Sequence, residues 1–237
     1  MMLSVVGFTH KGTLRKQNQD RVLVHNQVIT DERFEMEIMQ PSHFFVADGV
    51  GGMPAGDVAA NFVLTRMNDF LSPQVHPGRD QLCNLFHTIN RELHEFSQLN
   101  PEYEGMATTL AGVLIQEQQY QIISAGDSQV YLCRLSKLNK LTSEPVFGEM
   151  GGNNPITSYF GGNISSLNIT VSGFDQLSQG DVFFVATDGI FKALTVSQIE
   201  KILSNSKSLK EKSDFVFYKA MQMGSPDNIS CIFIHIN

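Results

Sequence analysis

The sequence is poor in the residues that build disulfide frameworks, zinc sites and nucleic-acid surfaces. It has three cysteines among 237 residues, and Cys83, Cys133 and Cys231 are too widely spaced to form a CxxC pair. A disulfide framework or zinc knuckle is therefore not expected, and free thiols fit a reducing cytoplasm. Lysine and arginine (17) are outnumbered by aspartate and glutamate (24), and the net charge of −7 argues against a nucleic-acid partner.

Long apolar segments and flexible linkers are also absent from the sequence. No run approaches the length of a membrane-spanning helix, and Met1 to Phe8 is too short for the apolar core of a signal peptide. We therefore expect a cytoplasmic protein without a membrane partner. No linker rich in proline or serine and no repeat divides the chain, so residues 1–237 are predicted to form a single domain.

Two apolar runs of the chain end in the same way. The runs at 43–47 and 182–187 are each followed by an Asp-Gly pair, which places the carboxylates of Asp48 and Asp188 at their ends. Each run predicts a buried strand, and the glycine allows the backbone to turn sharply after the carboxylate.

Further aspartates occur in similar settings, at Asp20, Asp127 and Asp227. This pattern indicates that carboxylates gather at one edge of a sheet. Clustered carboxylates repel one another, and leaving them unpaired in a partly buried site is costly. A bound cation is the simplest resolution, and oxygen ligands favour Mg²⁺ or Mn²⁺ over zinc or copper.

The spacing of apolar residues predicts an α+β fold with two packed, mostly antiparallel sheets and helices outside. Strands are expected at 3–8, 21–25, 43–47, 108–115, 119–125, 129–134, 167–171, 181–186 and 229–236. Helices are expected at 56–71, 79–99, 195–203 and 209–223. Thr195 and Gln198 form a capping box at the start of the third helix. The stretch 142–163, rich in Gly, Asn, Pro and Ser, is expected to be a mobile surface loop.

Three other features have both a chemical and a plain structural interpretation. Arg15, between the first two strands, could hold a phosphate through two parallel hydrogen bonds or be a solvated loop arginine. The glycine-rich stretch after Asp48 could approach an ion closely, but it lacks the Gly-Lys-Ser/Thr of a phosphate loop. Thr108 and Thr109 could hydrogen-bond an active-site loop, although strand propensity explains them equally well.

Taken in order, these elements resemble the successive motifs of the protein phosphatase 2C family, and most of all its compact bacterial members. That family consists of metal-dependent Ser/Thr phosphatases. The resemblance extends from Gly7 to Asn237. The matching residues are Arg15, Asn18 and Asp20; Asp48, Gly49, Gly51 and Gly52; Gly105, Thr108 and Thr109; Gly126, Asp127 and Ser128; Thr187, Asp188 and Gly189; and Asp227, Asn228 and Ile229.

The resemblance implies a four-layer α-β-β-α sandwich, with two mainly antiparallel sheets flanked by helices. It also implies two Mn²⁺ or Mg²⁺ ions with a possible third. Asp48 would bridge the pair, the Gly49 carbonyl would bind one ion, and Asp188 and Asp227 would bind the other. Asp20 would act near the same pair, directly or through water.

The implied reaction is hydrolysis of phosphoserine and phosphothreonine by a hydroxide that bridges the two metal ions. Arg15 would hold the substrate phosphate beside Asp20 and Asp48, and Asp127 would help Asp188 to form the third metal site. The expected partners are phosphorylated proteins, the substrates of a cognate Ser/Thr kinase, and the enzyme is expected to be a monomer. Two alternatives stay open: a catalytically weak pseudophosphatase or scaffold, and a phosphatase of small phosphoesters.

The sequence departs from the family pattern at several positions. Gln19, Val50 and Gln129 stand where many members carry Glu, His and Arg. Residues 142–145 replace the usual Thr-x-Asp-His, and the long flap that normally follows is nearly deleted between Leu141 and Gly161. These departures leave the expected metal ligands in place and bear on substrate selection.

Overall fold

The computed structural model describes residues 1–39, 41–50, 55–71, 77–143, 158–162 and 167–237. The strands are β1 (Met2–His10), β2 (Arg21–Val24), β3 (Gln27–Ile29), β4 (Arg33–Met39), β5 (Ser42–Ala47), β6 (Ala107–Thr108), β7 (Leu110–Gln116), β8 (Gln119–Ala125), β9 (Gln129–Arg134), β10 (Lys137–Lys140), β11 (Phe160–Gly161), β12 (Thr170–Val171), β13 (Asp175–Gln176), β14 (Val182–Ala186) and β15 (Ile229–Ile236). The helices are α1 (Gly56–Phe70), α2 (Arg79–Leu99), η1 (Pro101–Tyr103), α3 (Asp188–Ala193), α4 (Val196–Leu203) and α5 (Leu209–Met223).

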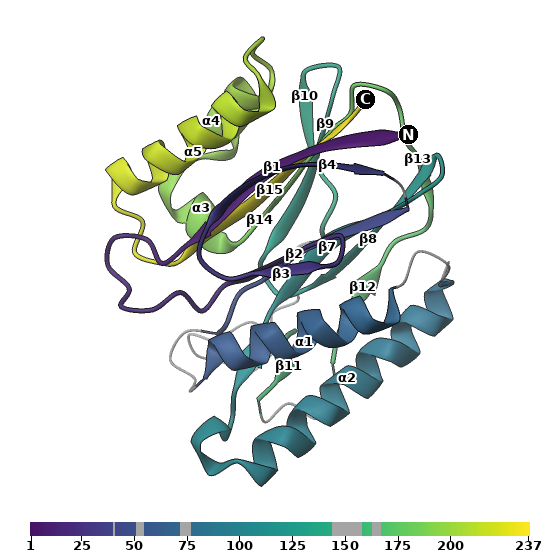
Figure 1. The fold of residues 1–237 in the computed structure, drawn as a ribbon, viewed down its shortest axis with the longest axis vertical. Helices are drawn as coiled ribbons and strands as arrows, with labels where there is room; N and C mark the ends of the chain where they lie inside the picture. The colour runs from purple at the N-terminus through teal and green to yellow at the C-terminus, as the bar shows by residue number, and fades with distance from the viewer. Residues whose placement is uncertain (40, 51–54, 72–76, 144–157, 163–166) are drawn as a thin grey trace.

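Most of the strands form two antiparallel sheets that lie face to face (Figure 1). The first sheet has the order β10-β9-β14-β15-β1-β4, and the second has the order β12-β8-β7-β5-β2-β3 with β13 also paired to β8. The short strands β6 and β11 pair separately. Leu3 lies opposite Ile236 in the β1–β15 pairing, so the two chain termini are neighbours.

The central strands, such as β5, β14 and β15, are apolar on both faces because they lie between the other sheet and a layer of helices. On β15, Ile232 and Ile234 face the space between the sheets, whereas Cys231 and Phe233 face the helices. β5 alternates in the same way between the central core and the core beneath α1 and α2. Strands buried on both faces appear in the sequence as continuous apolar runs, which is why the run at 43–47 shows no polar alternation.

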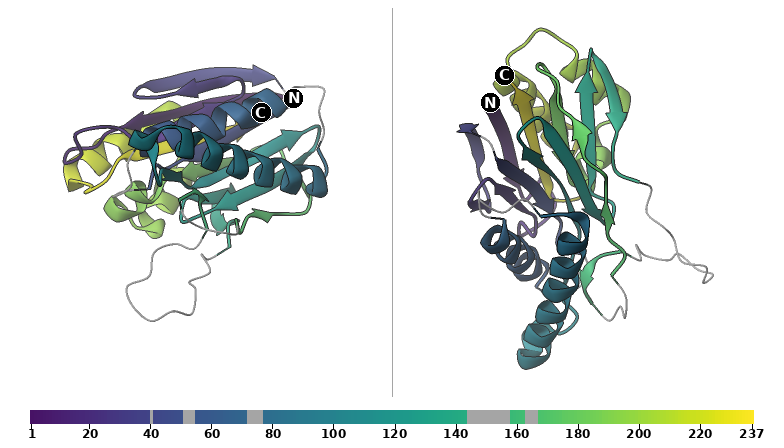
Figure 2. Two further views of the ribbon diagram at one scale, coloured as in Figure 1. Left: turned by 90° about the horizontal axis from the view of Figure 1, so that it is seen from below. Right: turned by 90° about the vertical axis from the view of Figure 1, so that its right-hand side faces the viewer.

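The helices form the two outer layers of the molecule. α1 and α2 cover the β5-containing sheet, and α3, α4 and α5 cover the β14-containing sheet (Figures 1 and 2). The predicted four-layer α-β-β-α sandwich is therefore confirmed. Within the described ranges, no helix is both long enough and apolar enough to cross a lipid bilayer.

Every helix and strand expected from the sequence is present, with two changes of extent. The expected strand 108–115 is divided at Thr109, and the expected strand 167–171 is reduced to Thr170–Val171. The capping box of α4 is confirmed, since Thr195 and Gln198 exchange backbone and side-chain hydrogen bonds. Most of the expected loop at 142–163, and with it the shortened flap, lies outside the described residues.

Candidate active site

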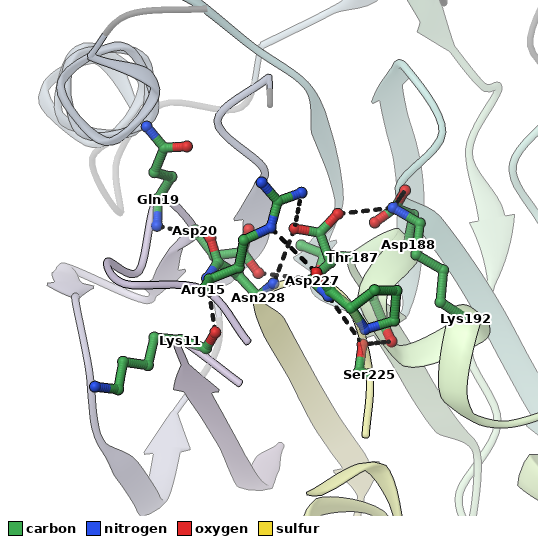
Figure 3. Close-up of polar contacts among 12 residues, drawn as sticks. Lys11, Arg15, Gln19, Asp20, Thr187, Asp188, Lys192, Ser225, Asp227 and Asn228 are labelled. Carbon is green, nitrogen blue, oxygen red and sulfur yellow. Dashed lines mark hydrogen bonds and ion pairs between the residues drawn. The ribbon is translucent and has the colours of Figure 1, made fainter. Parts of the chain in front are cut away.

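Five aspartates come from the ends of strands in both sheets. Asp20 immediately precedes β2, and Asp48 immediately follows β5 in the same sheet. Asp188 opens α3 after β14, and Asp227 lies just before β15 in the other sheet. Asp127 lies in the turn from β8 to β9, which joins the two sheets. Folding thus brings the predicted carboxylates to one end of the sandwich, where the charges of the other four act on Asp48. Figure 3 shows three of them, Asp20, Asp188 and Asp227.

Asp20 is fully buried and has only one of its two oxygens satisfied. Its Oδ2 accepts hydrogen bonds from Thr187 Oγ1 at 2.9 Å and from Ser230 Oγ at 2.6 Å. Its Oδ1 has no hydrogen-bond partner among the residues that the structure describes. Burial raises the pKa of Asp20 to about 7, and the charges of Asp227 and Asp188 act in the same direction.

The backbone of Asp48 is held by the two threonines at the break between β6 and β7. Thr109 N donates to Asp48 O at 2.9 Å, and Asp48 N donates to Thr109 Oγ1 at 3.2 Å. Thr108 Oγ1 also donates to Asp48 O, at 3.0 Å. The threonines thus hydrogen-bond the loop that carries Asp48, and Thr108 also lies in a strand, so the structure is consistent with both interpretations.

Gly49 contacts the start of α1 so closely that a side chain would not fit. A Cβ at Gly49 would lie 2.5 Å from the backbone carbon of Gly56. The close approach places the N-terminus of α1 against the loop after Asp48. A glycine after the carboxylate is therefore required for packing, whatever its carbonyl binds.

Asp188 and Asp227 share one lysine. Lys192 Nζ lies 2.5 Å from Asp188 Oδ2 and 2.7 Å from Asp227 Oδ2 (Figure 3). Arg15 Nη2 lies 2.9 Å from Asp227 Oδ1, and Arg15 Nε donates to the carbonyl of Pro226. Burial alone would raise the pKa of Asp227, but the hydrogen bond and charge of Lys192, together with Arg15, hold it below its usual value.

Asn228 fastens the loop that carries Arg15 to the start of β15. Its amide nitrogen donates to the carbonyls of Lys11 and Gln17, at 3.0 and 2.9 Å. Its amide oxygen accepts from Gln19 N at 2.9 Å. The loop from β1 to β2 is therefore held at the site by hydrogen bonds to a residue that is distant in the sequence.

The pKa values of Asp127 and Asp48, like that of Asp20, are raised. Burial raises the pKa of Asp127 to about 6, and the charge of Asp188 adds to the increase. Burial and the charges of Asp20, Asp188, Asp127 and Asp227 raise the pKa of Asp48 well above its usual value. Carboxylates perturbed in this way gather at functional sites and call for a positive partner.

The donor set fits a hard divalent cation. Asp20 Oδ1 and Asp188 Oδ1 are buried and have no hydrogen-bond partner in the described part of the chain. Unsatisfied carboxylate oxygens beside repelling charges are the ligands that Mg²⁺ or Mn²⁺ would satisfy. Among the same residues, no three His, Cys, Asp or Glu side chains converge as metal ligands do. Instead, Lys192 and Arg15 form ion pairs with Asp227, and Lys192 also forms one with Asp188.

Comparison with known proteins decides the family. The family model described as protein phosphatase 2C matches residues 30–228, which is most of the chain. The chain belongs to the protein phosphatase 2C family. The resemblance drawn from the ordered aspartate and glycine motifs is thus confirmed.

Relatives of this protein phosphatase 2C chain occur in several bacteria. It is 27% identical to the serine/threonine phosphatase stp of Listeria monocytogenes, covering 95% of this chain and 93% of that protein. It is 25% identical to the protein phosphatase PhpP of Streptococcus pneumoniae, covering 97% and 96%. The fold is similar to that of the S. agalactiae serine/threonine phosphatase, with a TM-score of 0.82, 23% identity, and coverage of 99% and 100%.

Neither Lys192 nor the hydroxyls of Thr187 and Ser230 were expected from the sequence to contact the aspartates. A signal for Lys192 was available, because it follows Asp188 by four residues and this spacing brings two side chains together on a helix. α3 is only six residues long, too short to show periodicity, so the helix itself was not expected. Arg15 lies beside the aspartates, where it pairs with Asp227, and its expected role in holding a phosphate stays a prediction.

Proposed function

We propose that this chain is a metal-dependent protein phosphatase that hydrolyses phosphoserine and phosphothreonine. The observation that carries the proposal is the cluster of buried and half-buried carboxylates on the fold of this family, in which Asp20 and Asp188 each have one oxygen without a described hydrogen-bond partner. Its relatives are named serine/threonine phosphatases, and phosphorylated proteins are the substrates we propose here. The two alternatives, a scaffold and a phosphatase of small phosphoesters, have no specific observation in their favour.

We assign the metal sites by position in the cluster. Asp48 would bind both Mn²⁺ or Mg²⁺ ions. The Gly49 carbonyl would help it to hold one of them, and Asp188 and Asp227 would hold the other. Asp20 would support the same pair, because its unsatisfied Oδ1 faces no other described partner. When bound, the ions would supply an acidified water as nucleophile and positive charge for the phosphate.

Asp127 and Arg15 complete the proposed assignment. Asp127 lies close enough for the charge of Asp188 to raise its pKa, which suits a weaker third ion. Arg15 has a side chain that is 41% exposed and lies beside Asp227. Its planar guanidinium would hold two phosphate oxygens, and the positive charge would offset the negative charge that the transferred group carries.

The domain organisation, assembly state, location and substrates of the enzyme belong to the same proposal. We propose that residues 1–237 act as one catalytic domain, as a monomer in the cytoplasm, on proteins phosphorylated by a cognate Ser/Thr kinase. The proposed ligands lie in loops of both sheets, so the catalytic centre needs nearly the whole chain.

The first test is hydrolysis of a phosphothreonine peptide and of para-nitrophenyl phosphate in Mn²⁺, in Mg²⁺ and in EDTA. We expect activity with metal, none in EDTA, and a loss of about a hundredfold or more in Asp188→Asn, because one ligand oxygen would no longer carry charge. Asp175→Asn, at an exposed position of β13, is the matched control and should retain wild-type activity. A wild-type protein that binds Mn²⁺ but hydrolyses neither compound would contradict the proposal.

A further inference from the structure

Lys192 bridges two carboxylates of the cluster and keeps part of its side chain exposed. Its ammonium contacts Asp188 Oδ2 and Asp227 Oδ2 at 2.5 and 2.7 Å, so it bridges two residues of different strand ends (Figure 3). The contact with Asp188 is built into α3, because the two residues lie one helical turn apart. The contact with Asp227 then joins α3 to the segment that precedes β15.

The electrostatics of the cluster explain why a cation is held there. Two carboxylates from separate segments would repel each other, and the charges of Asp188 and Asp227 also act on the nearby Asp20 and Asp48, whose pKa values they help to raise. The two hydrogen bonds and charges of Asp188 and Asp227 outweigh the burial of Lys192 and raise its pKa. The lysine therefore carries its full charge and neutralises the pair.

We propose that Lys192 is a built-in counter-cation that competes with a divalent metal ion for Asp188 and Asp227. The inference rests on the metal site of the proposed function, and it goes beyond that function by naming a residue that sets the metal affinity. In the metal-free protein Lys192 holds the two carboxylates together. A metal ion that binds both carboxylates must displace the ammonium. The free energy of the two lost ion pairs therefore reduces the free energy of metal binding.

The position of Lys192 makes this displacement feasible. Its side chain is 40% exposed, and it extends from the last turn of a six-residue helix, so the ammonium can move into solvent without unpacking the core. Arg15 contacts the other oxygen of Asp227, Oδ1, and therefore does not block the same position. In the part of the chain that the structure describes, Lys192 is the cation that contacts both carboxylates.

The inference predicts two opposite effects of one substitution. In Lys192→Gln the uncharged side chain no longer competes, so Mn²⁺ should bind about tenfold more tightly. The same variant should melt at a lower temperature than the wild type in EDTA, because Lys192 no longer offsets the repulsion between Asp188 and Asp227 and only the Arg15 ion pair with Asp227 is left. Isothermal titration calorimetry with Mn²⁺ and thermal unfolding in EDTA measure the two effects without any substrate.

Two further variants separate the charge of Lys192 from other causes. Lys192→Arg keeps the charge and should bind Mn²⁺ about as weakly as the wild type. Lys219→Gln removes one positive charge from the surface of α5. Lys219 Nζ donates to the amide oxygen of Gln222 rather than to a carboxylate, so this variant should match the wild type in both measurements. An Arg variant that binds as tightly as Lys192→Gln would overturn the inference, because the charge would then not be the cause.

Unchanged or weaker Mn²⁺ binding in Lys192→Gln would also overturn the inference, as would an unchanged melting temperature in EDTA. Failure of the proposed function has a different signature. A wild-type protein that binds Mn²⁺ without hydrolysing phosphoesters would contradict the phosphatase activity, while the difference in affinity between wild type and Lys192→Gln would still support the counter-cation.

Discussion

Asp20 is a carboxylate whose surroundings differ strongly between the unfolded and the folded chain. It is fully buried, and two hydroxyls, of Thr187 and Ser230, stabilise only one of its oxygens. These hydrogen bonds lower its pKa by less than burial raises it, so the pKa rises from the ordinary value of 3.8 to about 7. The residue is therefore destabilising when it is ionised and metal is absent.

We expect the metal-free protein to lose stability as the pH rises from about 4 to about 7. In this interval Asp20 is ionised in the unfolded chain but keeps its proton in the folded protein. The folded state then binds more protons than the unfolded state, so the free energy of unfolding falls as pH rises. Asp127, whose pKa is raised to about 6, contributes in the same direction. Urea unfolding in EDTA across this pH range measures the slope.

The substitution Asp20→Asn isolates the contribution of this residue. Its neutral amide keeps the shape of the carboxyl group, so we expect a flatter pH dependence and a gain on the order of 3 kcal/mol above pH 7 in EDTA. In Mn²⁺ the same variant should lose part of the metal-dependent stabilisation. Asp175→Asn at its exposed position should keep the wild-type slope. A slope in Asp20→Asn equal to that of the wild type would contradict this explanation.

Among the elements, α3 depends on one glycine. Gly189 lies against the backbone carbonyl of Asn228, and a Cβ at this position would overlap that oxygen. The close approach places Asp188 beside Asp227, which directly precedes Asn228. The spacing of the two carboxylates is thus set by backbone contact between α3 and the start of β15.

We expect Gly189→Ala to separate these two segments. The added methyl group must displace α3 or β15, at a cost of about 1–3 kcal/mol in the free energy of unfolding, and Mn²⁺ should bind more weakly. Urea unfolding and calorimetry give the two values. Gly173→Ala is the matched control, because a Cβ there meets nothing within 4 Å. If both alanine variants bind Mn²⁺ equally well, the contact of Gly189 with Asn228 does not set the site.

The helices and strands differ in how well they can be predicted from the sequence. Buried strands such as β5 and β14 and the long helices were predictable, because their apolar runs and periodicity are local signals. β4 was missed although Phe34, Met36 and Ile38 alternate with charged residues, a pattern that does indicate a strand. β3 and α3 were missed because three and six residues are too few to establish a period.

The candidate site was predictable in its residue types but not in its contacts. The repeated Asp-Gly endings and the family motifs selected all five aspartates. The pairing of Arg15 with Asp227 joins residues 212 positions apart, a contact that only the strand order creates. The same holds for Asp20 and Ser230, 210 positions apart. Local sequence carries no information on such contacts.

At the scale of the whole molecule, the site joins the two sheets at one end of the sandwich. Asp20 and Asp48 belong to strand ends of one sheet, and Asp188 and Asp227 to those of the other. Metal ions held by all four would cross-link the sheets at a point where like charges otherwise separate them. Ligand binding to the folded state alone stabilises it, by about 2.7 kcal/mol at a hundred times the dissociation constant.

We therefore expect Mn²⁺ to slow amide hydrogen exchange in the site loops of both sheets at once. The amides to follow are those of Gln19 and Thr109 on one side and of Thr187 on the other, since each donates a hydrogen bond within the site. Asp188→Asn should abolish the protection in both sets, because ions that bridge the sheets require ligands from each. Protection confined to the loops of one sheet would mean that the metal binds there alone, and that the second pair of aspartates serves Lys192 and Arg15 instead.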